Sequence, residues 1–368
     1  MNKEWLSVRI VHTKGGIRLI NENSPLVRIH PETVNNKVGT FKTPNYGALF
    51  DSIESLTLPI IGVEFYSYSH QFEGKDLPEW RVYARNRLTV WDNENAAILW
   101  SNIGTGAHEN RNGRLWDVAS RISHQLRVCA WRLKELSDSY NNQLISKISK
   151  NNYKNGSRFS DGFTWLCYMA IESFLVDVCI LRDYLSEYAA HYVFNLFVDE
   201  KLPNVTSLSG LRKYILKKAT SNDELFIEFN KITEEDGWLK DLGGYRDLVV
   251  HSAPLAQAEK RLFAICDSVS INGGELPAIS CPIPKKPMDI AASRASGSLF
   301  EDFEKQFELF VGMTNKKEPQ IDGLEYCHSV MANISKLANK LAARTPVKPK
   351  VKVFDKSNII GEFKYGTI

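Results

Sequence analysis

The chain has 368 residues, with 46 Lys and Arg against 43 Asp and Glu and a formal net charge of +3 at pH 7. This balance excludes a protein that coats nucleic acid by charge alone, but it allows a local basic surface. The first sixteen residues, MNKEWLSVRIVHTKGG, lack the apolar block of a secretory signal, and no run approaches the roughly eighteen apolar residues of a membrane helix. We therefore expect a soluble, cytoplasmic protein that enters no membrane.

Short strand-like runs fill residues 5–100, separated by Gly, Pro, Asn and Asp turns. The runs are WLSVRIVH, IRLI, PLVRIH, LTLPIIGVEFYSYSH, WRVYARNRLTVW and AAILW. They predict a β-rich accessory or sensor region over residues 1–112. The stretch SNIGTGAHENRNGR, residues 101–114, has the composition of a loop, so we expect a flexible linker there.

The apolar period changes to 3.6 residues after this stretch. Apolar side chains from Leu115 to Tyr140 share one helix face and predict a long helix that ends near residue 149. A second helix over 163–197 is apolar around most of its circumference, as in the middle of a bundle. Shorter helices follow in LSGLRKYILKKA and NDELFIEFNKIT. The predicted fold is α+β and mainly α, an antiparallel helical bundle over 113–345 preceded by the β-rich region.

The segment LGGYRDLVVHSAP, residues 242–254, combines residue types suited to phosphodiester chemistry. Arg246 is followed directly by Asp247 and, five positions on, by His251. The planar guanidinium of an arginine can bind a phosphate, and a histidine can move a proton to or from a ribose hydroxyl. Asp247 is expected to orient Arg246 or His251.

An ideal helix would separate the two main residues of this segment. Residues five apart lie about 140° apart around a helix axis, so Arg246 and His251 would not share a face. Gly243 and Gly244 loosen the start of the segment, and Pro254 cannot continue a regular helix. We therefore expect a short or kinked helix at the motif.

Long antiparallel helices followed by an Arg, a polar residue and a His five positions after the Arg resemble the HEPN superfamily, whose active members are metal-independent ribonucleases. Residues 113 to about 262 carry the resemblance. It implies that His251 acts as general base or acid at the 2′-hydroxyl and 5′-oxygen, while Arg246 stabilises charge on the phosphorane. It also implies a homodimer that brings two copies of the motif into one groove.

Three other residues are candidates around this motif. Glu172 lies in the most apolar part of the second helix and needs a partner, and Asp183 lies eleven residues on, near the same face. Either could pair with Arg246, or form an ordinary ion pair with Arg182. Tyr245 could stack on an RNA base or belong to the core.

The C-terminal part is expected to contain a β-hairpin over 261–285, helices in SLFEDFEKQFELFVGM and DGLEYCHSVMANISKLANKLAAR, and a basic tail over 346–368. The two helices could complete the bundle or a dimer. The tail is either an RNA-contacting arm or a solvated extension.

The expected function is an endoribonuclease acting on RNA, a toxin or phage-defence effector, restrained or activated by an unidentified protein. The alternative is a catalytically silent scaffold that binds RNA or protein. The six cysteines show no metal-binding spacing and are expected to be reduced core residues; no metal or cofactor is expected.

Overall fold

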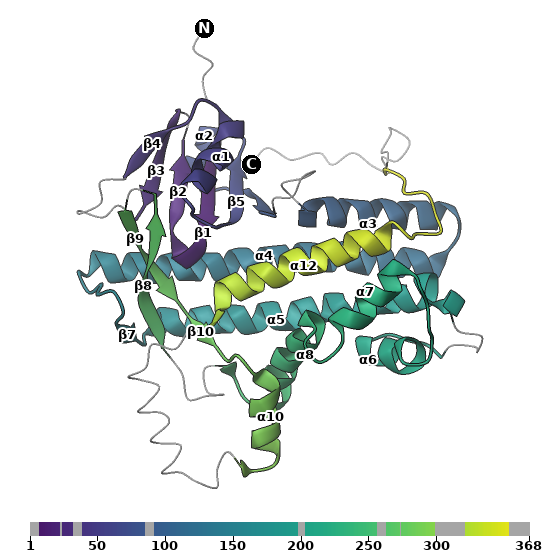
Figure 1. The fold of residues 1–368 in the computed structure, drawn as a ribbon. Coiled ribbons are helices and arrows are strands. Elements are labelled where there is room, and N and C mark those ends of the chain that lie inside the picture. The colour runs from purple at the N-terminus through teal and green to yellow at the C-terminus, as the bar shows by residue number, and fades with distance from the viewer. Residues whose placement is uncertain are drawn as a thin grey trace, which may run out of the picture.

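The computed structural model describes residues 7–22, 24–31, 39–84, 92–197, 203–255, 263–272, 274–298 and 321–352. An antiparallel sheet lies on one side of a group of long helices, and shorter helices lie on the opposite side (Figure 1). The fold is α+β and mainly helical, as the sequence predicted.

The N-terminal sheet has six strands in the order β4-β3-β2-β1-β5-β6, and all neighbours in it are antiparallel. Its strands are β1 (Val8–Thr13), β2 (Arg18–Asn21), β3 (Leu26–His30), β4 (Thr40–Lys42), β5 (Ile60–Tyr66) and β6 (Glu79–Val82). The helices α1 (Tyr46–Ser55) and α2 (Ser69–Glu73) interrupt the strands. Burial alternates along β3, as expected for a strand with one face on the core.

The helix α3 (Asp92–Glu109) corrects two predictions. AAILW is not a strand, and most of the stretch expected to be a linker is helical. A Cβ on Gly106 would lie 2.4 Å from the carbonyl oxygen of Lys348, so this glycine permits close packing instead of loop flexibility. The predicted boundary at residue 112 falls in the turn between α3 and the next helix.

Three long helices pack side by side (Figure 1): α4 (Gly113–Ser149), α5 (Gly162–Tyr188) and α12 (Gly323–Ala342). The first two confirm the predicted pair and run antiparallel. Asn112 caps α4 by accepting from the N–H of Leu115, and Asp161 forms a capping box with Thr164 at the start of α5. The π turn η2 (Ala189–Val193) and the 3-10 turn η3 (Asn195–Phe197) complete the predicted second helix.

The continuous helical stretch Gly162–Val193 is the most apolar of the described helices. Its best window has a mean hydropathy of 1.6, so by length and composition it could cross a membrane, contrary to the expectation that no stretch approaches this limit. Half of that window is buried inside the protein. The core helices of soluble proteins have the same length and composition, so this helix does not show whether the protein enters a membrane.

The remaining elements are short. The helical ones are η1 (Lys14–Gly16), α6 (Leu208–Leu211), η4 (Arg212–Leu216), α7 (Glu224–Ile232), α8 (Trp238–Asp247), η5 (Leu248–Ser252) and α10 (Pro287–Ala295). The strands are β7 (Arg158–Phe159), β8 (Ala264–Ile271), β9 (Gly274–Ser280), β10 (Pro282–Ile283) and β11 (Ile321–Asp322). The predicted hairpin is confirmed as β8 and β9, while most of the helix expected in SLFEDFEKQFELFVGM lies outside the described residues.

The sheet and the helices share one continuous hydrophobic core. Trp80 Nε1 of β6 donates to the carbonyl oxygen of Ala130 in α4 at 2.8 Å. Gly16 has a φ of +83°, and a Cβ there would lie 2.7 Å from the carbonyl oxygen of Tyr140, so the contact of η1 with α4 requires glycine. All six cysteines are free and buried, as predicted.

The described part of the basic tail is packed against the helices. The N–H of Lys350 donates to the carbonyl oxygen of Asn102 in α3 at 2.9 Å, and its ammonium pairs with Glu109. Up to residue 352, the tail therefore contacts α3, and its contact with RNA stays a prediction. The rest of the tail lies outside the described residues.

Candidate functional site

The RDLVVH motif lies where α8 changes into the π turn η5. Leu248 is fully buried and anchors this turn in the core. The N–H of Ala253 donates to the carbonyl oxygen of Leu248 at 2.8 Å, the five-residue hydrogen bond that defines a π turn. Ala253 itself is extended, and Pro254 follows it. The bend expected at the motif is thus a π turn that ends before the proline.

The wider turn brings the two principal residues together. Arg246 Nη1 lies 3.2 Å from His251 Nε2, although an ideal helix would point the two side chains in different directions. A guanidinium only donates, so Nε2 of His251 is the acceptor in this contact. His251 is exposed and the side chain of Arg246 is 38% exposed, so both can meet a ligand from solvent.

Asp247 contacts the same arginine nitrogen. Arg246 Nη1 donates to Asp247 Oδ1 at 2.9 Å, the orienting contact expected of this carboxylate. Both contacts of the guanidinium use Nη1. Among the described residues, Nε and Nη2 of Arg246 have no hydrogen-bond partner, and this edge of a guanidinium can bind two oxygens of one phosphate.

Glu172 and Asp183 do not contact Arg246, so their predicted pairing with it is wrong. Glu172 Oε1 accepts from the N–H of Leu255 at 2.7 Å, because the chain after Pro254 passes against α5. Asp183 pairs with Arg182 at 3.1 Å, the ordinary ion pair that was the alternative, and also accepts from the N–H of Leu208.

Tyr245 is a core residue and is not available to stack on a base. It is 1% exposed, its hydroxyl donates to the carbonyl oxygen of Pro284, and its ring lies 4.8 Å from that of Tyr326. The prediction of a substrate contact here is therefore wrong. Tyr245 faces the core, whereas Arg246, the next residue on the helix, is partly exposed to solvent.

A cavity of about 760 Å³ adjoins the motif. Arg246 and Asp247 form part of its wall, and Gly243 and Gly244 expose backbone to it. The charged lining residues contributed by other positions are Arg182, Asp183, Arg212, Lys213, Lys217 and Lys240. No local pattern predicted this arrangement, because Arg212, Lys213 and Lys217 lie about thirty residues before the motif.

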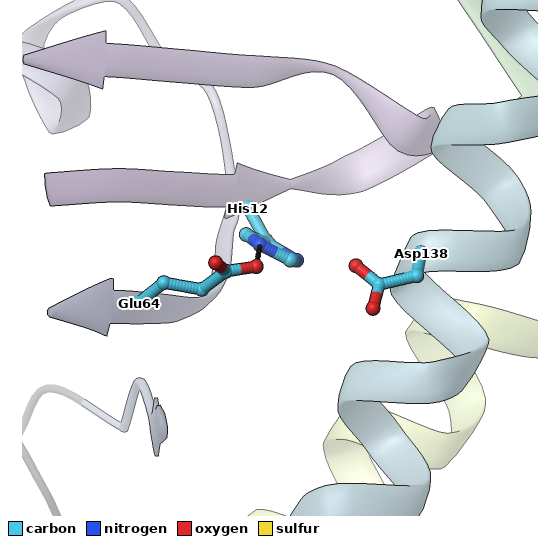
Figure 2. Close-up of side chains that lie close together, drawn as sticks. All are labelled: His12, Glu64 and Asp138. Carbon is cyan, nitrogen blue, oxygen red and sulfur yellow. Dashed lines mark hydrogen bonds and ion pairs between the residues drawn. The ribbon is translucent and has the colours of Figure 1, made fainter. Parts of the chain in front are cut away.

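A second polar cluster lies between the sheet and α4 (Figure 2). His12 Nε2 donates to Glu64 Oε1 at 2.8 Å, and Ser137 Oγ donates to His12 Nδ1 at 3.0 Å. Atoms of His12, Glu64 and Asp138 lie close enough together to ligate a metal ion. However, the ammonium of Lys134 already lies 3.0 Å from Glu64 and 2.9 Å from Asp138, and the guanidinium of Arg18 also pairs with Asp138, so two cations balance the two carboxylates.

This second cluster has the order of a nucleophilic triad, but it is closed to substrate. His12 is 0% exposed and Ser137 is 1% exposed, and neither residue lines the cavity beside the motif. Burial lowers the pKa of His12 to about 4, so its imidazole is neutral at pH 7. We interpret the cluster as a structural link that fixes the sheet on α4.

No family model, curated protein or solved structure matches this chain. The residues themselves and the motif resemblance are therefore the grounds on which a function can be proposed.

Proposed function

We propose that this protein is a HEPN-type endoribonuclease that cleaves RNA through attack of a ribose 2′-hydroxyl on the adjacent phosphate. The observation that supports this function best is the 3.2 Å contact between Arg246 and His251 on an accessible π turn. The pair places a phosphate-binding cation beside a proton acceptor, the two groups that this reaction requires. The resemblance to HEPN ribonucleases implies that no metal takes part, so we propose a metal-independent reaction.

In the proposed reaction, His251 Nε2 accepts the proton of the 2′-hydroxyl while the 2′-oxygen attacks phosphorus. The bond from phosphorus to the 5′-oxygen breaks, and the leaving oxygen takes a proton from an imidazolium. The products are a 2′,3′-cyclic phosphate, which water can open to a 3′-phosphate, and a 5′-hydroxyl. DNA is not cleaved because it lacks the 2′-hydroxyl.

Arg246 has a separate task in this scheme. Its Nε and Nη2 edge binds the non-bridging oxygens, where negative charge increases in the phosphorane, while Asp247 holds Nη1. In the free protein Nη1 also donates to His251 Nε2, so substrate must displace this bond before the imidazole can accept a proton. Asp247 is a positioning residue, since a carboxylate at the scissile phosphate would repel it.

A homodimer would supply one imidazole as base and the other as acid. An apolar seam on one face of α5 supports this arrangement, because its residues recur at spacings of three, seven and four, which keep them on one side of a helix. The seam consists of the exposed Leu166, Met169 and Ile180 and the half-buried Val176. Met169 is 58% exposed, and Glu172, which contacts Leu255 beyond the motif, borders the seam. We propose a second copy of this chain as its occupant.

The proposed biological role is that of a toxin or phage-defence effector restrained or activated by an unidentified protein. The restraint is inferred from the resemblance, because a ribonuclease active without a signal would damage its own cell. The role rests on the family resemblance and is separate from the cleavage proposal.

The decisive experiment is cleavage of total RNA and tRNA in EDTA by the wild type and by Arg246→Ala and His251→Ala. We expect products with 2′,3′-cyclic ends and at least about a 100-fold loss in both variants. Arg127→Ala and His124→Ala are matched controls, because these residues are exposed on α4 away from the motif. Circular dichroism checks folding. Cleavage that persists in the two motif variants would contradict the proposal, and RNA binding without cleavage favours the silent scaffold.

A further inference from the structure

The cavity beside the motif is strongly basic. Of the described residues that line it, six are cations and two are carboxylates. The carboxylates are Asp183 and Asp247, and each pairs with the arginine next to it in sequence. The other four cations, Arg212, Lys213, Lys217 and Lys240, therefore have no carboxylate partner among the lining residues. Such a concave basic surface raises the local concentration of anions.

The lining cations of η4, and Lys217 directly after it, form no ion pairs with other described residues. Among the described residues, neither Arg212, Lys213 nor Lys217 has a carboxylate within ion-pair distance, and the ammonium of Lys213 lies 5.0 Å from the ring of Tyr214. Lys240 pairs at 3.4 Å with Glu235, which is 92% exposed. Exposed pairs of this kind are weak, so Lys240 can exchange its partner for a ligand oxygen.

Two glycines of α8 in the cavity wall let neighbouring side chains pack closely against the helix backbone. A Cβ on Gly243 would lie 3.1 Å from Arg182 Nη1, and a Cβ on Gly244 would lie 2.8 Å from Met288 Cγ. The two glycines thus allow the side chains of Arg182 and Met288 to lie directly against the backbone of α8. The volume of about 760 Å³ lies within the range of pockets that hold small ligands, roughly 300–1,000 Å³.

We propose that this cavity binds the sugar-phosphate backbone of single-stranded RNA next to the scissile phosphate. This assignment rests on the proposed ribonuclease function. Arg246 belongs both to the motif and to the cavity wall, so a strand whose scissile phosphate contacts Arg246 continues into the basic cavity. Lys213 and Lys217 then contact flanking phosphates without reading the base sequence. A concave pocket admits a flexible single strand, whereas a duplex presents its phosphates on a convex rod.

Binding is tested with a fluorescent 2′-O-methyl RNA decamer, which lacks the nucleophile and cannot be cleaved by this reaction. Fluorescence anisotropy over a range of salt concentrations gives the dissociation constant and its salt slope for the wild type and for Lys213→Gln/Lys217→Gln. Each phosphate contact on a single strand contributes about 0.7 to the slope of log K against log salt. We expect the double variant to bind about tenfold more weakly, with a slope smaller by about 1.4.

The matched control is Lys154→Gln/Lys231→Gln, which removes the same charge from exposed positions outside the cavity. It should retain the wild-type slope to within about 0.3. If the cavity variant keeps the affinity and slope of the wild type, or if both double variants lose affinity equally, the assignment is wrong.

Cleavage kinetics separate failure of this assignment from failure of the proposed function. Lys213→Gln/Lys217→Gln should raise KM about tenfold and leave kcat within about twofold, because these side chains act in binding. A double variant that cleaves with unchanged KM contradicts the cavity assignment alone. Cleavage by His251→Ala at the wild-type rate contradicts the ribonuclease site, whatever the cavity binds.

Discussion

Glu172 Oε1 accepts a 2.7 Å hydrogen bond from the backbone N–H of Leu255, 83 residues further along the chain. Burial raises the pKa of Glu172, and the N–H of Leu255 offsets part of that shift. Because Leu255 follows the π turn by three residues, this bond holds the C-terminal end of the motif against α5. We therefore expect Glu172 to act as a positioning residue for His251, although it does not contact Arg246.

This relationship predicts different effects for two substitutions at one position. Glu172→Gln keeps a carbonyl acceptor for Leu255 and should cleave within about twofold of the wild type. Glu172→Ala leaves the N–H of Leu255 without its partner, which should cost about 1–2 kcal/mol of unfolding free energy and about tenfold in kcat. Urea unfolding and single-turnover cleavage measure the two effects. Equal activity of the two variants would show that the bond does not position the motif.

Two glycines in α3 give a second prediction. A Cβ on Gly104 would meet Ser120 Oγ at 3.4 Å, an ordinary contact, whereas a Cβ on Gly106 would lie 2.4 Å from the backbone oxygen of Lys348. Gly104→Ala should therefore be neutral or stabilise by up to about 1 kcal/mol, because alanine favours the helix. Gly106→Ala should destabilise by about 1–3 kcal/mol, because backbone must move.

Thermal unfolding and limited proteolysis of the C-terminal segment test this pair. Gly106→Ala should lower Tm and make proteolysis of the chain near Lys350 faster, because the C-terminal segment loses its hydrogen bond to Asn102. Gly104→Ala is the matched control on the same helix. If Gly106→Ala is as stable and as resistant as Gly104→Ala, the close packing of this segment on α3 is not maintained in solution.

The same glycines explain one failure of prediction from sequence. Gly104 and Gly106 favoured a loop, and AAILW is too short to distinguish a strand from a buried helix. Only the C-terminal segment, more than two hundred residues away, shows why a helix here needs glycine. Long helices such as α4 were predictable because their apolar period alone determines which face is buried.

The candidate site was predictable in part for a similar reason. Arg246, Asp247 and His251 lie within six residues, so their spacing was visible in the sequence. The π turn that joins them depends on the burial of Leu248. The partner of Glu172 and the cations of η4 are brought to the site by tertiary packing, for which the sequence carries no local signal.

The buried cluster between the sheet and α4 predicts acid sensitivity. Burial, reinforced by the charge of Arg18 and opposed by Glu64, lowers the pKa of His12 from 6.5 to about 4. Between these values the unfolded chain binds a proton that the folded protein does not. The free energy of unfolding should therefore fall as the pH drops from about 6.5 to about 4, by up to about 3 kcal/mol from this group.

Urea unfolding at pH 7.5, 6, 5 and 4.5 measures this dependence, and His12→Gln provides the comparison. Glutamine can donate to Glu64 and accept from Ser137, but it does not titrate. Between pH 6.5 and 4.5 the unfolding free energy of the variant should fall less than that of the wild type. The difference should be about what the binding of one proton to the unfolded state contributes. Parallel curves for the two proteins would show that His12 is not the responsible group.

The seam on α5 gives the last prediction, which concerns assembly. Met169 is 58% exposed at the centre of the seam, so Met169→Glu leaves the folded monomer intact but places a carboxylate in the proposed interface. An unpaired buried charge costs several kcal/mol, so the dimer dissociation constant should rise at least about 100-fold. Cleavage should fall with it, because each groove would lose the second copy of His251. Ile227→Glu is the control, since Ile227 is 52% exposed on α7 outside the seam.

Analytical ultracentrifugation and RNA cleavage across a concentration series connect the two effects. The activity of Met169→Glu should return at concentrations where its dimer forms. A wild type that remains monomeric while it cleaves RNA would remove the dimer from the mechanism and require both proton transfers to occur at a single Arg246 and His251 pair.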